Sequence, residues 1–354
     1  MVNLLLKHHR MQLPRELVVG NGTIESVAEI LHRLGFSKSA LIIAGPKTYL
    51  IAGKTVKDLH EKEGMEVNTF LVETATVKDV QAVEKKIESL KPQIVFGVGG
   101  GTKIDVAKCS SARHEVPFVS VPTTASHDGI ASPLSSVKGF EKPYSVMAQA
   151  PLAIIADTNI IMQAPWDFAI SGCGDVIAKF TAVKDWKLAR DEKNEYYGGY
   201  AASLALMSAK LVSQNAEIVK PDNEEGLRVL LEALISCGVS MSIAGSSRPC
   251  SGSEHMFSHA LDIVRPNHPM HGHQCGVGAV LMACLQRANW RGIRDTLKKL
   301  GAPTNADELG VEKDEIVEAL MMAGTVRPDR YTILTKQALN IEVCEKLAKT
   351  TGVI

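Results

Sequence analysis

Short apolar runs alternate with amphipathic stretches through the first half of the chain. The run Ile94-Val95-Phe96-Gly97-Val98 is typical of a strand that is buried on both faces. In Val77–Leu90, by contrast, apolar residues recur at helical spacing, and the stretch ends just before Pro92. The predicted strands are Ala40–Ala44, Val67–Val72, Ile94–Val98, Phe118–Val121 and Ala153–Ala156, and the predicted helices between them are Lys47–Glu63, Val77–Leu90 and Ile104–Ala112. This alternation predicts a parallel sheet covered by helices on both faces.

The strand pattern stops near residue 160. Helical periodicity continues in Tyr200–Val219, Gly226–Ile243, His255–Val264, Val277–Asn289 and Ile316–Ala323. We therefore predict an α/β domain over residues 1–160 and an all-helical domain over residues 161–354. The segment Thr123–Lys142 is rich in Ser, Pro and Gly and is predicted to be a loop that joins the two halves.

Composition narrows the class of protein. Of the 354 residues, 45% are hydrophobic and 22% charged, which excludes a disordered chain or a coiled-coil rod. The 39 basic and 39 acidic residues balance, so the chain lacks the overall basic charge that a nucleic-acid binder uses against phosphates. We therefore expect no nucleic acid among its partners.

The sequence also predicts a cytoplasmic protein without a membrane span. No apolar run reaches the roughly 18–20 residues needed to cross a bilayer. In Met1–Arg10, three leucines precede the charges instead of following them, unlike a signal peptide. The seven cysteines are scattered without a Cys-x-x-Cys pair, so we expect buried thiols in a reducing compartment and neither disulfides nor a thiolate zinc site.

Three consecutive glycines, Gly99 to Gly101, follow the strand Ile94–Val98 and open into a helix. Glycine lets the backbone approach a ligand closely, and a helix N-terminus offers unpaired N–H groups to a phosphate. The segment departs from the Gly-x-Gly-x-x-Gly pattern, because Thr102 holds the third glycine position, and it is not a P-loop. A tight turn without a ligand is the alternative, but three glycines after a strand favour phosphate binding.

Five of the eleven histidines are clustered at His255, His259, His268, His271 and His273. His255 and His259 share one helix face, yet no Glu lies between them as in zinc proteases. His271 and His273 fall in a predicted turn before a helix. Together with Asp175, at the predicted start of another helix, two histidines complete the three-ligand set of a catalytic zinc site. Taken singly, each histidine is more simply an ordinary hydrogen-bonded residue; the cluster favours a metal.

The segment Pro122–Pro133 follows the fourth predicted strand. Its Thr and Ser hydroxyls suit the phosphates or ribose of a cofactor, and Asp128 suits a substrate hydroxyl, although an ordinary turn capped by Asp would look the same. No Gly-x-Ser-x-Gly elbow is present, so a serine hydrolase of the α/β type is unsupported.

Five segments occur in the order found in a known family: Gly99–Asp105, Thr123–Gly129, Gly172–Asp175, Gly252–His255 and His271-Gly272. Over about residues 20–350 the chain resembles the iron-containing and glycerol-type polyol dehydrogenases. The segments Ser126–Pro133 and Met270–Gly276 are most similar to one branch, the archaeal sn-glycerol-1-phosphate dehydrogenases. The resemblance implies a Rossmann-like parallel-sheet domain followed by an all-α domain, as in dehydroquinate synthase and glycerol dehydrogenase.

The resemblance also implies roles for individual residues. The metal ligands would be Asp175, His255 and His271, with His273 as a rival to His271, and the catalytic and substrate-binding residues would be Asp128, Asp175 and His259. The cofactor-binding residues would be Gly99, Gly100, Gly101, Thr102, Lys103, Ile104, Asp105, Thr123, Thr124, Ala125, Ser126 and Ser132.

The implied reaction is reduction of dihydroxyacetone phosphate by NAD(P)H to sn-glycerol 1-phosphate, the backbone of archaeal membrane lipids. One Zn²⁺ per subunit would stabilise the negative charge on the substrate oxygen during hydride transfer. We also expect the subunits to form a homo-oligomer. We expect His127 or His259 to relay the hydroxyl proton to solvent.

Several alternatives stay open at this point. The chain could instead act on unphosphorylated glycerol or another polyol, run lyase chemistry like dehydroquinate synthase, or hold a purely structural metal. Asp and His also suit iron or nickel. Arg265, His273 and Lys138 are candidates for binding the substrate phosphate, and Glu73 and Thr74 for choosing between NAD and NADP.

Overall fold

A six-stranded parallel sheet occupies the first half of the chain. The structure, a computed structural model, describes residues 11–139 and 145–354. In the order β1-β8-β5-β4-β2-β3, all neighbouring strands of this sheet pair in parallel. The strands are β1 (Glu16–Gly20), β2 (Ser39–Ala44), β3 (Glu66–Leu71), β4 (Ile94–Gly99), β5 (Phe118–Pro122) and β8 (Ala153–Asp157). The five predicted strands are confirmed, each boundary lying within one residue of its predicted place.

The strand β1 was not predicted. It pairs only with β8, at the edge of the sheet, and Leu17 is 47% exposed. An edge strand that is partly solvated lacks the continuous apolar run that marks the buried strands.

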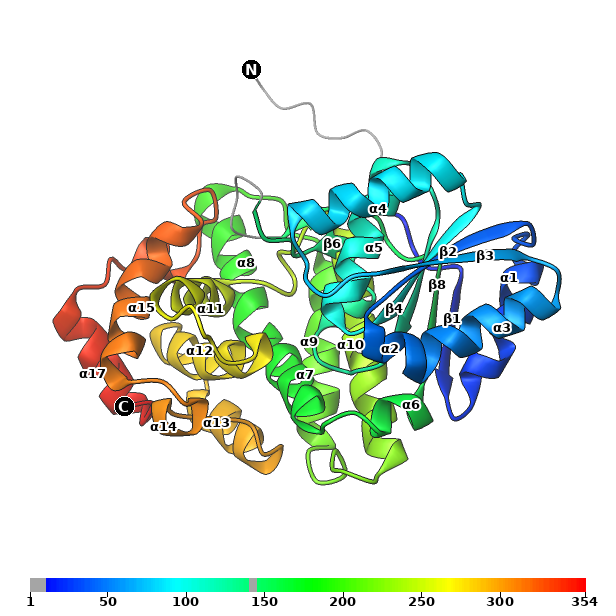
Figure 1. Ribbon diagram of the computed structural model, residues 1–354. Helices are drawn as coiled ribbons and strands as arrows, with labels where there is room; N and C mark the ends of the chain where they lie inside the picture. Colours follow the sequence, from blue (N-terminus) through cyan, green and yellow to red (C-terminus); the bar gives the residue numbers. More distant parts are fainter. Residues whose placement is uncertain (1–10, 140–144) are drawn as a thin grey trace, which may run out of the picture.

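Helices cover both faces of the sheet, as predicted (Figure 1). Along β2, Leu41 and Ile43 join one buried cluster, and Ala40, Ile42 and Ala44 join the other. The helices α1 (Val27–Arg33) and α3 (Lys54–Lys62) pack on the second cluster. The helices α4 (Val77–Leu90) and α5 (Gly101–Arg113) pack on the first. Both faces of the sheet are therefore shielded from solvent, which explains why the sequences of the strands are unbroken apolar runs.

The chain leaves two neighbouring strands toward opposite faces. From β2 it enters the short helix α2 (Pro46–Thr48), a π-helical turn (Tyr49–Gly53) and then α3. From β4 it enters α5 on the other face, although β2 and β4 are paired along Ala40–Ala44. Such a switch point opens a crevice beyond the carboxyl ends of the strands, where ligands of α/β proteins bind.

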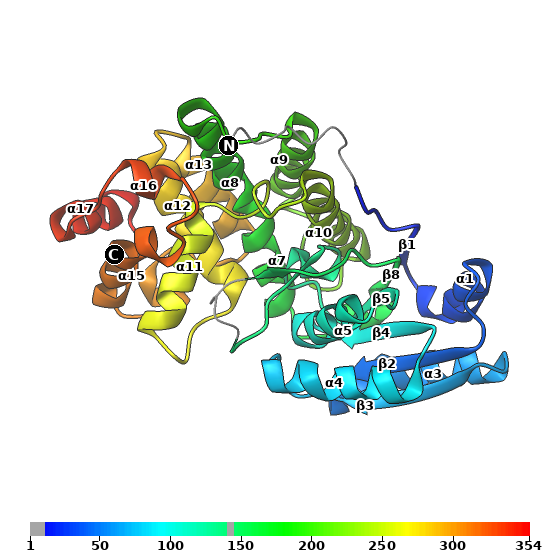
Figure 2. The ribbon, with the colours of Figure 1, turned by 90° about the horizontal axis from the view of Figure 1, so that it is seen from above.

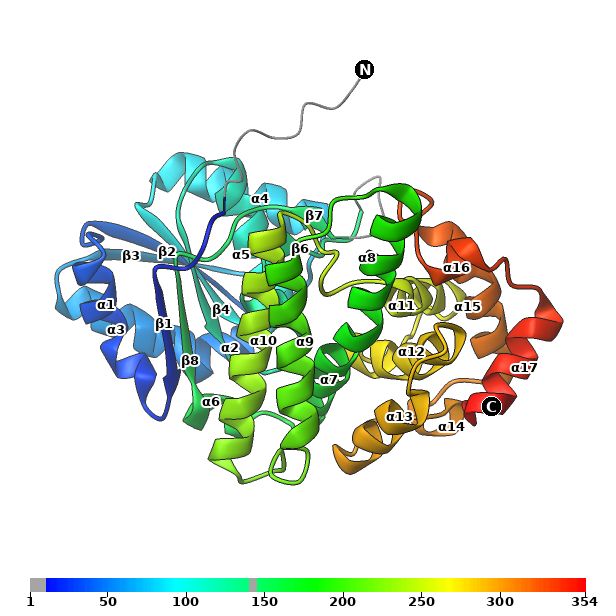
Figure 3. The ribbon, with the colours of Figure 1, turned by 180° about the vertical axis from the view of Figure 1, so that it is seen from behind.

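The second half is helical throughout, in agreement with the predicted fold class. Its helices are α6 (Thr158–Met162), α7 (Asp167–Ile177), α8 (Lys179–Lys193), α9 (Gly199–Gln214), α10 (Glu224–Ala244), α11 (Ser253–Val264), α12 (His271–Leu285), α13 (Trp290–Lys299), α14 (Ala306–Leu309), α15 (Lys313–Val326), α16 (Ile333–Lys336) and α17 (Ile341–Thr351). The pair α9 and α10 stands between the sheet and the remaining helices (Figure 3). The proposed domain boundary at residue 160 stays a prediction.

Three local predictions were wrong. Asp175 lies in the last turn of α7 instead of at the start of a helix, because the helix begins eight residues earlier. His271 is the first residue of α12, so the predicted turn around it is helical. The loop after β5 does not join the two halves, because the chain returns to the sheet as β8 before entering α6. That loop contains a short 3₁₀ turn (Asp128–Ile130) and the small hairpin β6 (Leu134–Ser135) and β7 (Val146–Met147); part of it lies outside the described residues.

One helix of the described chain, α10, is long and apolar enough to resemble a membrane span, with a mean hydropathy of 1.7 in its best window. However, 72% of that window is buried inside the protein. This burial is typical of a core helix. The segment Met1–Arg10, on which the prediction about a signal peptide depends, lies outside the described residues. All seven cysteines are free, and all except Cys284 are buried, as predicted.

Candidate functional site

Two imidazole rings from neighbouring helices face each other at the centre of the helical half. His255 on α11 and His271 on α12 have ring centroids 5.0 Å apart. The Nδ1 of His255 lies 2.8 Å from a carboxylate oxygen of Glu254, and the Nδ1 of His271 lies 3.2 Å from the hydroxyl of Ser258. One nitrogen of each ring is thus held by a neighbour, and the other is directed into the space between the helices.

Asp175 reaches the same space from α7. Its Oδ1 lies 3.6 Å from Nε2 of His255. The helices α7 and α12 can cross this closely because glycines stand at the contact: a Cβ at Gly174 would lie 2.1 Å from the carbonyl oxygen of Gly272, and a Cβ at Gly272 would lie 1.7 Å from that of Ser171. The three residues predicted as metal ligands are therefore brought together from three helices.

Cys275 was not predicted to be part of this cluster. It lies one turn after His271 on α12, and its Sγ is 3.5 Å from Nε2 of His271. The ligand atoms of His255, His271 and Cys275 all lie within 4.8 Å of one another. The i, i+4 spacing of His271 and Cys275 carried this signal, but it was hidden because α12 was predicted to begin only at Val277.

Lys179, at the start of α8, is a second residue that the sequence reasoning missed. Its ammonium is fully buried and lies 2.6 Å from Oδ1 of Asp175 and 2.8 Å from Oδ2 of Asp128. The backbone N–H of Asp128 also donates to Oδ2 of Asp175, at 2.9 Å. A loop of the sheet half is thereby tied to the helical half through one buried lysine and two carboxylates.

These charges stabilise one another against burial. Burial by itself disfavours ionisation, but the two carboxylates raise the pKa of Lys179 well above its ordinary value. Burial acts against Asp175 as well, yet Lys179 and His255 hold its pKa well below the usual range. Burial and the nearby Asp175 raise the pKa of Asp128. Of the two carboxylates, Asp175 is therefore the one that its neighbours keep ionised, as an anionic metal ligand must be.

His259 lies one turn after His255 on α11 and stacks on His271, with ring centroids 6.1 Å apart. Burial, together with the charges of His255, Arg327 and Arg330, lowers the pKa of His259 to about 3. The ring is therefore neutral at neutral pH and can offer a substrate a hydrogen bond but not a cation.

The donor set suits a divalent metal ion. A carboxylate and two imidazoles are the ligands that catalytic zinc sites use, and a fourth position is left open for substrate. The contacts of His255 with Glu254 and of His271 with Ser258 are the outer hydrogen bonds that usually orient metal-binding histidines. The same donors also suit iron or nickel.

The glycine turn meets the loop after β5 at the carboxyl end of the sheet. Gly99 has a φ of 151°, which favours glycine. A Cβ at Gly101 would lie 1.9 Å from Nε2 of His127, and one at Gly100 would lie 3.2 Å from the hydroxyl of Thr124. The N–H of Thr123 donates to the carbonyl of Gly99, at 3.1 Å. The two segments predicted to bind the cofactor are therefore in contact.

Around this turn, several predicted cofactor residues keep accessible polar groups. Thr102 at the start of α5 is half-buried. The hydroxyls of Thr124 and Ser126 lie 3.5 Å apart. Lys103 donates to the carbonyl of Glu73 at 2.8 Å, and Thr74 donates to Asp79 at 2.6 Å, so the end of β3 borders the same crevice.

Other predicted cofactor residues are engaged inside the protein. Asp105 is buried, lies 3.4 Å from the ammonium of Lys108 and accepts from the backbone N–H of Ser136. Lys108 in turn donates to the carbonyls of Gly129 and Leu134, so this pair anchors the loop after β5. The remaining side chains are buried and leave mainly backbone groups for a ligand: Ile104, Thr123, Ala125 and Ser132.

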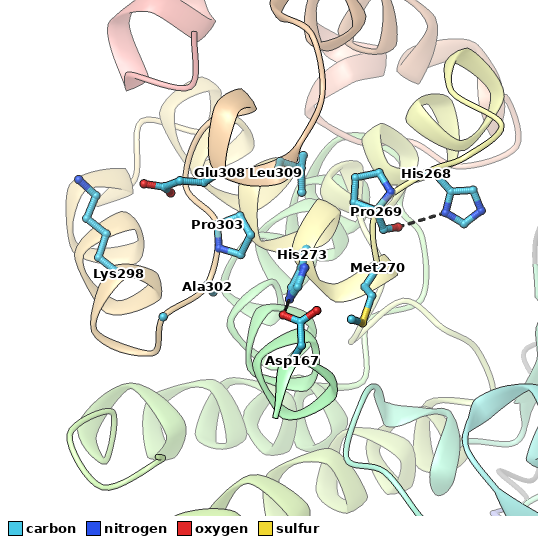
Figure 4. Close-up of a pocket in the computed structure, with 11 residues that line it drawn as sticks. Asp167, His268, Pro269, Met270, His273, Lys298, Ala302, Pro303, Glu308 and Leu309 are labelled. Atoms are coloured by element: carbon cyan, nitrogen blue, oxygen red, sulfur yellow. Dashed lines mark hydrogen bonds and ion pairs between the residues drawn. The ribbon is translucent and has the colours of Figure 1, made fainter. Parts of the chain in front are cut away.

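A separate pocket of about 770 Å³ lies beside the histidine cluster (Figure 4). His273 lines this pocket, and its Nε2 lies 3.5 Å from a carboxylate oxygen of Asp167. His268 and Met270 line the same pocket, together with residues of the segment Lys298–Leu309. This geometry favours His271 over its rival His273 as the partner of His255.

The chain is similar to curated proteins along nearly its whole length. It is 52% identical to a glycerol-1-phosphate dehydrogenase of Methanosarcina mazei, over 97% of this chain and 96% of the relative. It is 51% identical to the enzymes of the same name from Pyrococcus furiosus (98% of this chain, 100% of the relative) and Aeropyrum pernix (98% and 99%). The names of all three give NAD(P)+ as the cofactor. The sequence profile of the iron-containing alcohol dehydrogenases matches residues 18–165.

Solved structures share the fold. Glycerol dehydrogenase from Schizosaccharomyces pombe superposes with a TM-score of 0.81 at 21% identity, covering 98% of this chain and 90% of the other. Sulfoacetaldehyde reductase from Bifidobacterium kashiwanohense, in complex with NAD+, superposes with a TM-score of 0.72 at 17% identity, covering 97% and 98%. At these identities the likeness concerns the fold alone.

Proposed function

Because the chain belongs to the family of glycerol-1-phosphate dehydrogenases, we propose how its own residues perform that family's reaction. The protein is an NAD(P)-dependent oxidoreductase that acts on a secondary alcohol and interconverts dihydroxyacetone phosphate and sn-glycerol 1-phosphate, the backbone of archaeal lipids. This identity argues against the polyol dehydrogenase, the lyase and the non-catalytic metal protein considered from the sequence.

Asp175, His255 and His271 would hold one Zn²⁺ per subunit. The observation that carries this proposal is the convergence of their side chains from three helices, with Nε2 of His255 3.6 Å from Asp175. When bound, the ion would stabilise negative charge on the substrate oxygen, while the nicotinamide would carry the hydride. Glu254, fully buried and bonded to His255, would keep the imidazole in the orientation that presents Nε2.

Asp128 would bind a hydroxyl of the substrate. Its carboxylate lies at the meeting point of the two halves of the chain and is held by Lys179, at 2.8 Å. Lys179 would act as a positioning residue, because its ammonium fixes the two carboxylates without occupying the imidazoles. His259, neutral at neutral pH, would contact the substrate through a hydrogen bond, and His127, beside Gly101, would connect the site with the cofactor turn.

The cofactor would lie across the carboxyl end of the sheet. Its pyrophosphate would face the backbone N–H groups of Gly100, Gly101 and Thr102 at the start of α5. Thr124 and Ser126 would reach the cofactor with their hydroxyls, whereas Asp105 and Ser132 would act by holding the surrounding loop.

We also propose that the enzyme is cytoplasmic and works as a homo-oligomer. An exposed apolar face of α9 supports the homo-oligomer. Tyr200 is 72% exposed and Met207 is 58% exposed, and Leu211 lies on the same face of the helix. Light scattering coupled to size-exclusion chromatography tests the oligomer: a monomer at micromolar concentration would contradict it.

The decisive experiment compares substrates. Purified protein is assayed for NADH and NADPH oxidation with dihydroxyacetone phosphate, dihydroxyacetone and a dehydroquinate precursor side by side. We expect stoichiometric oxidation with dihydroxyacetone phosphate, and a product that an sn-3-specific glycerophosphate dehydrogenase does not oxidise. A faster reaction with dihydroxyacetone would contradict the proposed substrate.

A further inference from the structure

The helix α10 packs directly against the loop after β5, on the side of the sheet half (Figure 2). A Cβ at Gly238 would lie 2.5 Å from the carbonyl carbon of Ala131 and 2.6 Å from the backbone nitrogen of Ser132. Glycine is needed here because any side chain would push the helix and the loop apart. The preceding residue on α10, Cys237, is fully buried, so its thiol lies close to the place where the helix meets the loop that carries Asp128.

A second buried thiol, that of Cys250, lies beside Cys237. The segment between α10 and α11 brings it there: the Sγ of Cys250 donates to the carbonyl oxygen of Cys237, at 3.3 Å. The same sulfur lies 3.2 Å from the hydroxyl of Ser240. The two cysteines are 13 positions apart, so a search of the sequence for Cys-x-x-Cys pairs could not find them.

The segment that carries Cys250 is held firmly in place. Its backbone N–H donates to the carbonyl oxygen of Ser247, at 3.0 Å. Arg330 is 7% exposed and donates to the hydroxyl of Ser247 and to the backbone carbonyl of Ser251. The position of the Cys250 thiol is therefore fixed by the surrounding chain before any ligand arrives.

Asp128 completes a group of three donors. The two sulfur atoms and a carboxylate oxygen of Asp128 all lie within 4.8 Å of one another. Both cysteines are buried, whereas the side chain of Asp128 is 15% exposed, so an ion can enter the group from the side of Asp128. The ammonium of Lys179 contacts both Asp128 and Asp175. The group thus adjoins the three predicted metal ligands without sharing a residue with them.

We propose that Asp128, Cys237 and Cys250 form a second metal site, which takes a thiophilic divalent cation such as Cd²⁺ or excess Zn²⁺. Two thiolates and a carboxylate are a soft donor set that prefers these ions to Mg²⁺ or Ca²⁺. Each thiol gives its proton to water when its sulfur binds the ion. The three negative charges are then balanced by the divalent cation and the ammonium of Lys179, which limits the cost of burying them.

Occupation of this second site withdraws Asp128 from the substrate. This step rests on the proposed function, in which Asp128 binds a substrate hydroxyl. A thiophilic cation therefore inhibits the enzyme in competition with dihydroxyacetone phosphate, while the zinc ion assigned to Asp175, His255 and His271 stays in place.

The binding test titrates the zinc-loaded protein with Cd²⁺ and follows the ultraviolet charge-transfer absorption of cadmium bound to thiolate. We expect one further cation per chain in the wild type, with the zinc retained by elemental analysis. Cys250→Ala should remove the absorption band and weaken Cd²⁺ binding at least about 100-fold, and Cys237→Ala should do the same. Cys275→Ala, which removes the buried thiol beside His271 instead, should leave the band and the affinity unchanged.

The kinetic test measures inhibition by Cd²⁺. In the wild type, Cd²⁺ should raise the KM for dihydroxyacetone phosphate at constant kcat. Cys250→Ala should be about 100-fold less sensitive, while its kcat/KM without cadmium and its NADPH affinity stay within about threefold of the wild type, which shows an intact fold.

The outcomes separate the metal site from the proposed function. A wild type without the charge-transfer band would overturn the site, as would a band that Cys275→Ala removes and Cys250→Ala keeps. Inhibition that lowers kcat at constant KM would overturn the competition at Asp128. Failure of the wild type to reduce dihydroxyacetone phosphate would overturn the proposed function instead, while the Cd²⁺ titration would still decide whether the two thiols bind a metal ion.

Discussion

The ammonium of Lys179 lies 2.6 Å from Oδ1 of Asp175, across the junction of α7 and α8, with both side chains buried. The same nitrogen contacts Asp128 in the loop after β5. One buried cation thus connects a carboxylate proposed to bind the metal with a carboxylate proposed to bind the substrate. Lys179 therefore holds one acidic side chain from each half of the chain in place.

Replacing Lys179 by Met should destabilise the protein by about 3–5 kcal/mol, because two buried carboxylates lose their counter-charge. Urea denaturation followed by circular dichroism measures the change. Lys184→Met, an exposed position on the same helix, serves as the control and should shift the free energy of unfolding by less than about 0.5 kcal/mol. Equal effects of the two substitutions would contradict the assignment.

Metal removal should abolish catalysis without unfolding the protein. Dialysis against a chelator is expected to lower kcat/KM at least about 10³-fold, with recovery on addition of Zn²⁺, while the far-ultraviolet circular dichroism stays unchanged. His255→Ala should bind less than a tenth of the zinc that the wild type holds, measured by elemental analysis. His268 is not one of the three proposed ligands and contacts Asp262, so His268→Ala should retain the full complement of zinc. Loss of fold on chelation would point to a structural metal instead.

His259→Ala should reduce kcat/KM by a similar factor at every pH between about 6 and 9. The pKa of His259, lowered to about 3 by burial and neighbouring positive charges, keeps the ring neutral over that whole range. Only below about pH 4 would it gain a proton, so it contributes a hydrogen bond and no titration to the profile. Steady-state profiles of both proteins decide this: disappearance of an inflection near neutral pH in the variant would mean that His259 does exchange the proton.

Gly101→Ala should weaken binding of NADPH about tenfold or more. A Cβ at this position would lie 1.9 Å from Nε2 of His127, so the imidazole must leave its place between the loop after β5 and the turn that faces the cofactor. Fluorescence titration gives the affinity. Gly199→Ala at the start of α9, where no atom lies within 4 Å of the added carbon, should leave it unchanged. Unaltered binding by Gly101→Ala would show that the contact between the two loops is not needed.

Most strands and helices of the α/β half could be predicted from the sequence. Strands buried on both faces give unbroken apolar runs, and the helix Val77–Leu90 was located to the residue because its apolar spacing and the Pro92 that follows it are local signals. The edge strand β1 was missed because it is partly exposed, and the start of α12 was missed because Gly272 and Gly276 pack against other helices instead of following a helical apolar pattern.

The chain by itself determined the fold class, the family and the residue types of the site, because apolar periodicity and short motifs are properties of neighbouring residues. The tertiary structure alone decided which side chains meet. Lys179 and Cys275 carry no motif, and each gains its significance from residues tens of positions away that the packing of the chain brings within reach. The physical reason is that burial and charge act through space. In the sequence a lysine is an ordinary helix residue, and only the fold buries it away from water beside two carboxylates.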